Sequence, residues 1–303
     1  QKTILKPITF KGIGLHSGVS SEIKILPAKA DYGIIFKRVD LDKNNEVRAI
    51  YDNVSSAMLC TTLQNKFGVT VSTVEHLLAA LYISGIDNAL IEINNQEIPI
   101  MDGSSKEFVE TIINTGLKNL LMNRKYLKIK KKVELEDNEK KISIEPNEES
   151  LKVKFQLVYN NAVIGIQKNE INFKDSGLDE VYSSRTFCLY EDIEKIKKSG
   201  LAKGGSLKNA IVVKNKEILN VEGLRNSKEF VNHKILDLAG DFLLSGYRIL
   251  GSVECTQGGH SLSNKFIREL FKDSSNFEVV EADYKNSIKS IYKTSINKIA
   301  VNA

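Results

Sequence analysis

The sequence predicts an α+β fold made of a duplicated unit, and two observations support this prediction. Alternating polar and apolar stretches, typical of strands, surround two helix-forming stretches that each end at a Ser-Gly pair. Aligning the two pairs places His76 and Asp237 at the same position, eight residues upstream, and in both halves a strand, a loop and a short helix follow. Because the sequence identity between the halves is slight, chance similarity is the alternative explanation.

The first half contains strand and helix patterns in the order expected for such a unit. Strands are predicted for the alternating stretches EIKILPA, GIIFKRV and NALIEINNQEIPI. A helix over VSTVEHLLAALYISG is expected to end at Gly85. A second helix, over SSKEFVETIINTG, should open with a serine cap and close at Gly116.

The second half repeats this order after a lysine-rich linker, LMNRKYLKIKKKVELED, that runs into a new strand. Further strands are predicted for KKISIEP, SLKVKFQLVY and RILGSVE, and helices for FVNHKILDLAGDFLLSG and NKFIREL. A chain of 303 residues suits two domains better than one. We therefore expect an N-terminal domain over residues 1–122, a C-terminal domain over residues 126–275 and a tail over residues 276–303.

Composition and charge argue against several classes of protein. The net charge is +5 with lysines spread along the chain, which predicts a solvated surface and no nucleic-acid partner. Three widely spaced cysteines without a CxxC pair suggest neither a disulfide framework nor a cysteine zinc cluster, and fit a reducing cytoplasm. No apolar run approaches the roughly 18 residues that span a bilayer. We expect a cytoplasmic protein without stable membrane insertion that could still act on a lipid.

The stretch FVNHKILDLAGDFLL places three polar side chains on one face of an otherwise apolar helix. His233, Asp237 and Asp241 are four residues apart, and at about 3.6 residues per turn such positions share a face. His233 and Asp237 can therefore direct their ligand atoms to one point, which favours a metal site. A core histidine with its hydrogen bonds satisfied is the alternative.

A histidine from the first half can complete this site. If the two helices pack together, His76 faces His233 and Asp237, and two histidines with one carboxylate leave an open position, as in catalytic zinc sites. Glu75 points about 100° away around the helix, close enough to act as a general base toward water. For His76 taken alone a core role is the more common outcome, and the HExxH pattern is absent.

His260 lies in QGGHSLSN, on a tight turn after a strand, where functional groups collect. A carboxylate from Asp241 would raise the pKa of this imidazole and keep it protonated as a general acid. An exposed histidine on an ordinary glycine turn is the alternative. From the residues alone, either His260 or Asp237 can be the third metal ligand.

Eight strings between residue 12 and about residue 270 resemble one family. They are GIGLHSG, CTTL, VSTVEHLLAALYISGIDNALIEI, EIPIMDGSS, SRTFC, GLAKGGSLKNAIV, EGLRNSKEFVNHKILDLAGD and GGHSLSNK, in the family's order. The chain resembles the metal-dependent UDP-3-O-acyl-N-acetylglucosamine deacetylases of Gram-negative lipid A synthesis. The resemblance implies two similar α+β domains with helices sandwiched between two β-sheets.

The resemblance also implies roles for the catalytic residues. The metal ligands would be His76, His233 and Asp237, which would hold Zn²⁺, with Fe²⁺ as the alternative ion. Glu75 would be the general base that activates water against the acetamide carbonyl. The departing amine would be protonated by His260, whose charge Asp241 would support.

Further residues would contact the substrate, again by resemblance. Thr186 would help to hold the oxyanion, Phe187 and Lys234 would contact the sugar and the diphosphate, and Tyr159 would stack on the base. Cys60 would lie near the site without being a ligand. Two positions depart from the family pattern: Gln257 replaces a common Lys or Arg, and the family's Phe-Asn-His-Pro stretch reads Tyr159-Asn160-Asn161-Ala162.

An insert at about residues 189–220 resembles the family's hydrophobic passage for the 3-O-acyl chain. The apolar residues expected to line it are Leu201, Ile211, Val212 and Val213. Each buried methylene of such a chain contributes about 0.8 kcal/mol. The alternative is that these residues only pack the insert's own small core.

The expected function is zinc-dependent hydrolysis of the acetyl group of UDP-3-O-acyl-N-acetylglucosamine, with release of acetate, by a monomer. Gln257 and Tyr159 keep open a zinc amidase that acts on another acylated sugar. A binding protein with a structural metal, or with none, is the alternative from another class. The role of His16 and of the tail is not predicted.

Overall fold

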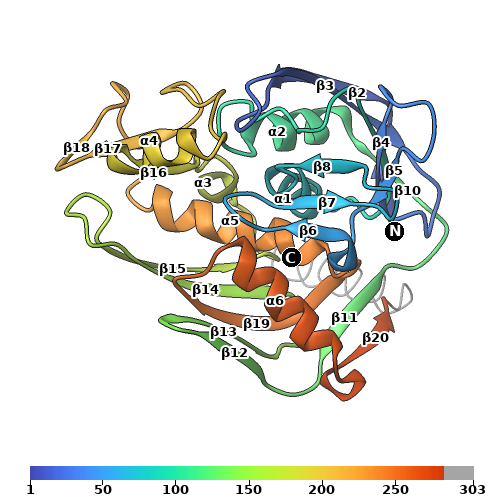
Figure 1. The fold of residues 1–303 in the computed structure, drawn as a ribbon. Helices are drawn as coiled ribbons and strands as arrows, with labels where there is room; N and C mark the ends of the chain where they lie inside the picture. Colours follow the sequence, from blue (N-terminus) through green and yellow to red (C-terminus); the bar gives the residue numbers. More distant parts are fainter. Residues whose placement is uncertain (283–303) are drawn as a thin grey trace, which may run out of the picture.

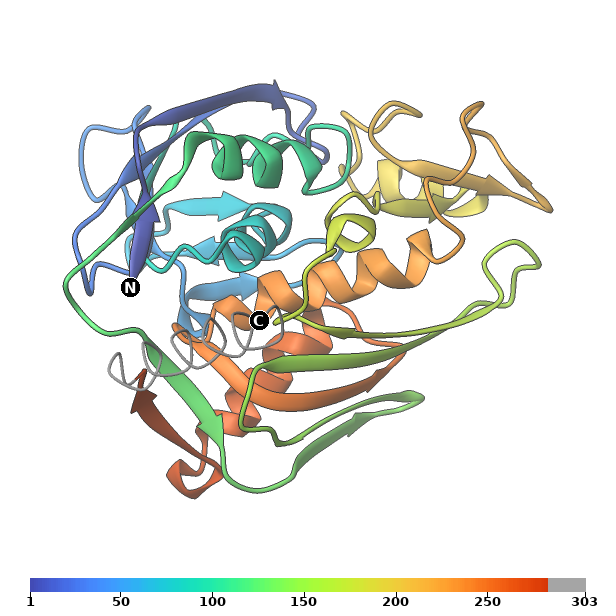
Figure 2. The same ribbon diagram turned by 180° about the vertical axis from the view of Figure 1, so that it is seen from behind.

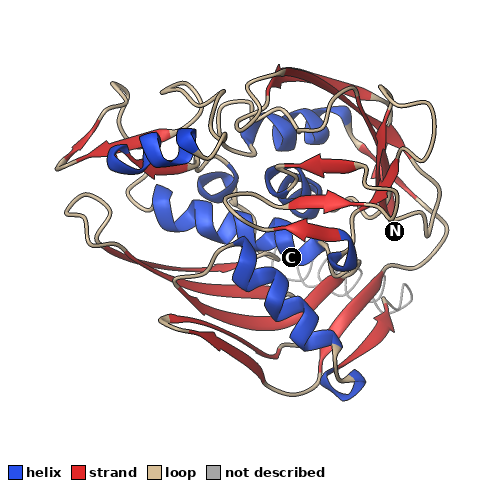
Figure 3. Ribbon diagram, viewed as in Figure 1, coloured by secondary structure: helices blue, strands red, loops and turns tan. Residues whose placement is uncertain are grey.

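The chain forms an α+β fold in which helices lie between two β-sheets (Figures 1 and 3). The computed structural model describes residues 1–282. The sheet of the first half has the order β2-β3-β9-β4-β5. Its strands are β2 (Ile8–Ile13), β3 (Ser20–Pro27), β9 (Ala89–Ile93), β4 (Ile34–Arg38) and β5 (Glu46–Arg48).

The sheet of the second half contains the order β12-β13-β19-β14-β15, and a further strand, β11, pairs with β19 and carries β20 on its other side. These strands are β12 (Val133–Asp137), β13 (Lys140–Pro146), β19 (Arg248–Thr256), β14 (Leu151–Val158), β15 (Ile166–Asn172), β11 (Lys125–Ile129) and β20 (Phe277–Glu281). The long strand β19 pairs with β11 through its first residues and with β13 and β14 through the rest.

The two halves share one topology, which confirms the predicted duplication. In the first half β9 pairs antiparallel with β3 and parallel with β4. In the second half β19 pairs antiparallel with β13 and parallel with β14. Both outer pairs, β2 with β3 and β12 with β13, are antiparallel, and so are β4 with β5 and β14 with β15.

The helices occupy equivalent places in the two halves. Helix α1 (Glu75–Ser84) precedes β9 and α2 (Lys106–Thr115) follows it, whereas α5 (Glu229–Leu243) precedes β19 and α6 (His260–Phe271) follows it. Helices α1 and α5 pack against each other between the sheets, as seen from both sides in Figures 1 and 2. Both are buried around nearly their whole circumference, and their polar side chains are buried with the apolar ones.

Three smaller sheets complete the part of the chain that the structure describes. Strands β6 (Val54–Ser56), β7 (Thr62–Gln64) and β8 (Thr70–Ser72) lead into α1, and β1 (Lys2–Ile4) pairs with β10 (Leu117–Asn119). The insert of the second half contains α4 (Tyr190–Lys198) and the strands β16 (Phe187–Leu189), β17 (Ile211–Lys214) and β18 (Glu217–Ile218). A short helix, α3 (Asp179–Tyr182), precedes it.

Three local predictions differ from the structure. Ser105 occupies the N-cap position of α2, but its hydroxyl makes no capping bond and instead donates to the carbonyl of His76, 2.7 Å away. Strand β11 lies inside the predicted linker and pairs with β19. Residues 277–281, assigned to the tail, form β20, because pairing with β11 extends the sheet; the predicted tail from residue 283 onward lies outside the described residues.

Gly240 of α5 allows the close approach of α1. A Cβ atom at this position would overlap the backbone carbonyl of Glu75. Alanine normally stabilises a helix interior by up to about 1 kcal/mol relative to glycine. We expect the opposite here: Gly240→Ala should lower the free energy of unfolding by about 1–3 kcal/mol, as overpacking does. Urea denaturation measures this change, and a variant more stable than the wild type would contradict the packing argument.

Candidate metal centre

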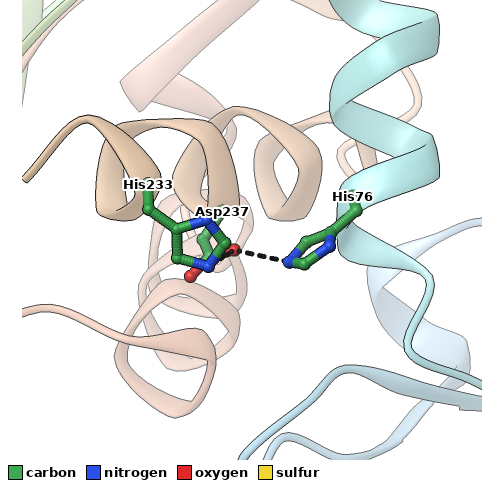
Figure 4. Close-up of side chains that lie close together, drawn as sticks. All are labelled: His76, His233 and Asp237. Carbon is green, nitrogen blue, oxygen red and sulfur yellow. Dashed lines mark ion pairs between the residues drawn. The ribbon is translucent and has the colours of Figure 1, made fainter. Parts of the chain in front are cut away.

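Helices α1 and α5 bring three buried side chains, the predicted metal ligands, to one point. His76 comes from the first turn of α1, while His233 and Asp237 lie one turn apart on α5 (Figure 4). Asp237 Oδ1 lies 3.5 Å from Nε2 of His76 and 3.4 Å from Nε2 of His233. One ligand atom from each residue falls within 4.8 Å of the others, so the three residues form a group that can hold a metal ion, called the metal group below.

The hydrogen bonds of this group suit a cation better than an empty core. Within residues 1–282, Asp237 Oδ1 is buried and has no hydrogen-bond partner, which is costly unless a ligand pairs with it. Nδ1 of His233 donates to the carbonyl of Ser184 over 3.1 Å, which leaves the lone pair of Nε2 free for a metal. Burial lowers the pKa of His233 to about 3, so the imidazole is neutral, as a ligand must be. The residues therefore fit a metal ion.

The second oxygen of Asp237 is held by Lys234. Its ammonium donates to Oδ2 over 2.9 Å. Burial acts to raise the pKa of Asp237, but the positive charges around it, among them Lys234 and the protonated His260, outweigh burial and hold the pKa well below its usual range. The aspartate is thus ionised, as a hard oxygen ligand should be.

Glu75 lies beside this group. Its Oε2 accepts a hydrogen bond from the backbone N–H of Thr61 over 3.0 Å, and its Oε1 lies 3.6 Å from Nε2 of His260. Glu75 is 3% exposed, and burial raises its pKa. A carboxyl whose pKa is moved toward neutrality is suited to proton transfer.

His260 is the first residue of α6 and is held by Asp241. Nδ1 of His260 donates to Asp241 Oδ2 over 2.9 Å, and Asp241 Oδ1 accepts from the hydroxyl of Thr61 over 2.7 Å. Burial acts to lower the pKa of His260, but the carboxylates of Asp241 and Glu75 raise it to about 10. Nε2 of His260 lies 3.9 Å from Asp237 Oδ2. The geometry therefore suits an acid beside the metal group better than a third ligand.

The metal group opens into a cavity of about 850 Å³ between the two halves. Among the residues that line it are the predicted substrate contacts Tyr159, Thr186, Phe187 and Lys234. The ring of Phe187 lies 5.8 Å from that of Tyr159, with the Lys234 ammonium 5.7 Å from its centre. A polar cavity with aromatic walls and the Lys234 ammonium suits a sugar that carries an anionic group.

An apolar cavity of about 370 Å³ in the insert adjoins the first one. The two cavities share four lining residues, which are Leu15, Leu59, Thr186 and Phe187. Val212 lines this second cavity, as predicted, whereas Ile211 and Val213 are fully buried in the packing of β17. The insert thus has both a small core of its own and an apolar hollow.

Two predicted substrate contacts do not lie on the walls of either cavity. The backbone N–H of Leu201 donates to the carbonyl of Ile196 and closes the turn after α4, so the next residue, Ala202, lines the hollow instead. Cys60 is buried with its Sγ 3.9 Å from the hydroxyl of Thr62, and burial raises its pKa to about 12.

Other contributors were missed by the sequence reasoning. Thr61 holds both Glu75 and Asp241, and its position inside the CTTL string was the available signal. The Ser184 carbonyl that orients His233 had no signal, because any residue supplies a carbonyl. Gln257, at the unusual position, accepts from the backbone N–H of Val158 over 2.9 Å.

Among the described residues, none of the helices is both long and apolar enough to cross a membrane. Together, the fold and the site define an α+β protein with a candidate metal centre and two connected cavities between repeats of one unit.

Comparison with known proteins shows which family the chain belongs to. Residues 1–272 match the family described as UDP-3-O-acyl N-acetylglycosamine deacetylase. A UDP-3-O-acyl-N-acetylglucosamine deacetylase of Geotalea uraniireducens is 41% identical over 99% of this chain and 97% of its own. Those of Legionella pneumophila and Wigglesworthia glossinidia brevipalpis are both 40% identical, over 96% and 92% of this chain and 96% and 94% of their own. The chain belongs to the UDP-3-O-acyl N-acetylglycosamine deacetylase family, which confirms the resemblance.

Proposed function

We propose that this chain hydrolyses the N-acetyl group of UDP-3-O-acyl-N-acetylglucosamine, releasing acetate, as a step of lipid A biosynthesis. The observation that carries the proposal is the convergence of His76, His233 and Asp237 beside Glu75 and His260 at the floor of one cavity. The family membership and the names of the relatives support the same substrate.

Zinc is the ion we propose for the group formed by His76, His233 and Asp237. Two imidazoles, one carboxylate and an open position are the usual ligands of catalytic zinc, and Fe²⁺ accepts the same donors. When bound, the ion would polarise the acetamide carbonyl and favour ionisation of water near neutral pH.

Glu75 and His260 are proposed to transfer the protons. Glu75 Oε1 would accept a proton from the attacking water, since its other oxygen is fixed by Thr61. His260, protonated because of Asp241, would give a proton from Nε2 to the departing amine. Because Glu75 Oε1 and His260 Nε2 lie only 3.6 Å apart, the proposed base and the proposed acid can both reach the same acetamide group. Thr186, on the cavity wall, would donate its hydroxyl proton to the oxyanion.

Asp241→Asn should change the pH dependence of turnover. The proposed acid works while His260 is protonated, which holds at pH values below its pKa. Removing the Asp241 charge lowers that pKa from about 10 toward the ordinary value for histidine. The alkaline limb of the kcat profile should therefore move to lower pH, whereas the same limb in wild type and variant would argue against His260 as the acid.

The adjoining apolar cavity is proposed to hold the 3-O-acyl chain. Leu207 lines it and is 44% exposed, so a charge is tolerated there by the fold. Leu207→Glu should raise KM for a long-chain substrate about tenfold, because losing about two methylene contacts costs that much. KM for a short-chain substrate should stay unchanged. Val221→Glu is the matched control, since Val221 is fully exposed and away from the cavity; equal effects of the two variants would contradict the assignment.

The test of the function is a deacetylation assay with purified protein, using the UDP-linked substrate and the same acylated sugar without UDP. We expect turnover of the first to exceed that of the second by a wide margin. Equal rates would favour an amidase of another acylated sugar, in line with the Gln257 side-chain oxygen accepting from the backbone N–H of Val158.

A further inference from the structure

Glu97 is a buried carboxylate outside the metal centre that the proposed mechanism does not use. It is 1% exposed. Its Oε1 accepts hydrogen bonds from the backbone N–H of His16 over 2.8 Å and from the hydroxyl of Thr73 over 2.9 Å. Its Oε2 accepts from the backbone N–H of Ser17 over 2.7 Å. All three donors are neutral, so this carboxylate is stabilised by hydrogen bonds to two separate segments.

The first of these segments is the entry to α1. Thr73 has a φ of 57°, in the left-handed region, and is 3% exposed. A β-branched residue rarely adopts this conformation, and such strain persists only where the surroundings hold it. Thr73 precedes Glu75 and His76 by two and three residues. Its backbone conformation therefore sets the direction in which α1 begins and where these two side chains point.

The second segment is the turn that contains GIGLHSG. While the N–H groups of His16 and Ser17 donate to Glu97, the carbonyls of Leu15 and His16 accept from the N–H groups of Gly204 and Lys203 in the insert. Leu15 and His16 both line the apolar cavity. The same carboxylate thus fixes one wall of the hollow proposed for the acyl chain.

Gly14 makes room for this arrangement. A Cβ atom on Gly14 would overlap the carboxylate of Glu97, so the turn can close over the carboxylate only without a side chain here. The glycine-rich turn, which matches no nucleotide-binding pattern, is accounted for by this contact.

We infer that Glu97 is a positioning residue that holds Thr73 in its left-handed conformation, so that Glu75 and His76 point toward the ligand residues of α5. Glu97 also fixes the turn of Leu15 and His16 against the insert. The effect on turnover rests on the proposed function. The effect on metal affinity does not, because it depends only on where His76 points.

The first experiment compares Thr73→Ala with Thr73→Gly. Both substitutions remove the hydroxyl that donates to Glu97, but only glycine adopts the left-handed conformation without strain. If the bond to Glu97 serves to hold that conformation, alanine should be the more harmful change. We expect Zn²⁺ affinity, measured by competition with a chelator, to be about tenfold lower in Thr73→Ala than in Thr73→Gly. Equal affinities, or a weaker site in the glycine variant, would overturn the inference.

The second experiment uses Glu97→Gln, with Glu22→Gln on the exposed face of β3 as the control. The three partners of Glu97 are all hydrogen-bond donors. The glutamine side chain replaces one acceptor oxygen with an NH₂ donor, so it cannot bond to all three. We expect kcat to fall about 100-fold through misalignment of Glu75, and KM to rise for long-chain but not for short-chain substrate. Thr73→Ala should lower kcat without this KM effect, because the turn of Leu15 and His16 keeps its bonds.

The outcomes separate this inference from the proposed function. A wild type without deacetylase activity would refute the function, while the chelator competition would still test the positioning of His76. A folded Glu97→Gln protein with wild-type kcat and metal affinity would refute the positioning role alone. If Glu97→Gln does not fold, the alanine and glycine pair at Thr73 remains decisive, since neither disturbs the backbone bonds to Glu97.

Discussion

Replacing His233 with alanine should leave the protein without tightly bound metal and lower its turnover about 1,000-fold, because a catalytic ion supplies several kcal/mol of charge stabilisation. His233 Nε2 faces Asp237 Oδ1 at 3.4 Å, and its other nitrogen is committed to the Ser184 carbonyl. No side chain from α5 replaces it, since all other residues of that turn except Lys234 are buried in packing. Elemental analysis beside a deacetylation assay measures both effects.

His260→Ala is the matched control for this prediction. It removes another buried histidine of the same cavity, but one that lies outside the metal group. The His260 variant should keep its metal and lose turnover, whereas the His233 variant should lose both. Equal metal content in wild type and His233→Ala would refute the assignment of the ligands.

The second large effect is expected for Glu75→Gln. The amide keeps the shape of the side chain, and its oxygen can still accept from the N–H of Thr61. It cannot accept a proton from water, so kcat should fall about 100- to 10,000-fold, the usual contribution of a general base. Metal content should stay at the wild-type level, because Glu75 is outside the group of three ligands.

Glu107→Gln provides the control. Glu107 lies in the first turn of α2, as Glu75 does in α1, but it is exposed. It should leave both turnover and metal content unchanged. Loss of metal together with activity in Glu75→Gln would show that Glu75 supports the structure of the site instead of acting on water.

Local periodicity explains why the centre of the site could be predicted. His233 and Asp237 lie one turn apart on α5 because a helix repeats every 3.6 residues, whatever it packs against. The placement of His76 opposite them followed from the repeat, because the equivalent helices α1 and α5 of the two halves pack against each other. By contrast, Thr61 holds both Glu75 and Asp241 by hydrogen bonds. It lies 180 residues from Asp241 in the sequence, so no local period links the two residues.

The contacts that depend on backbone groups escaped prediction for a similar reason. The carbonyl of Ser184 and the N–H groups of His16 and Ser17 carry no residue-specific signal. Leu201 was expected on the wall of the apolar cavity because it is apolar, but the turn after α4 gives that place to Ala202. In the same way, β20 could not be separated from a tail until its partner β11 was known.

The sequence by itself determined most of the helices and strands, the duplicated order and the candidates for the metal group, because helix and strand periods are local properties of the chain. Only the tertiary structure decided which groups orient those residues. Gly240 sets the distance between α1 and α5, and Glu97 joins the entry of α1 to the wall of the apolar cavity. Both depend on close approach between segments remote in sequence, which packing selects and periodicity does not encode.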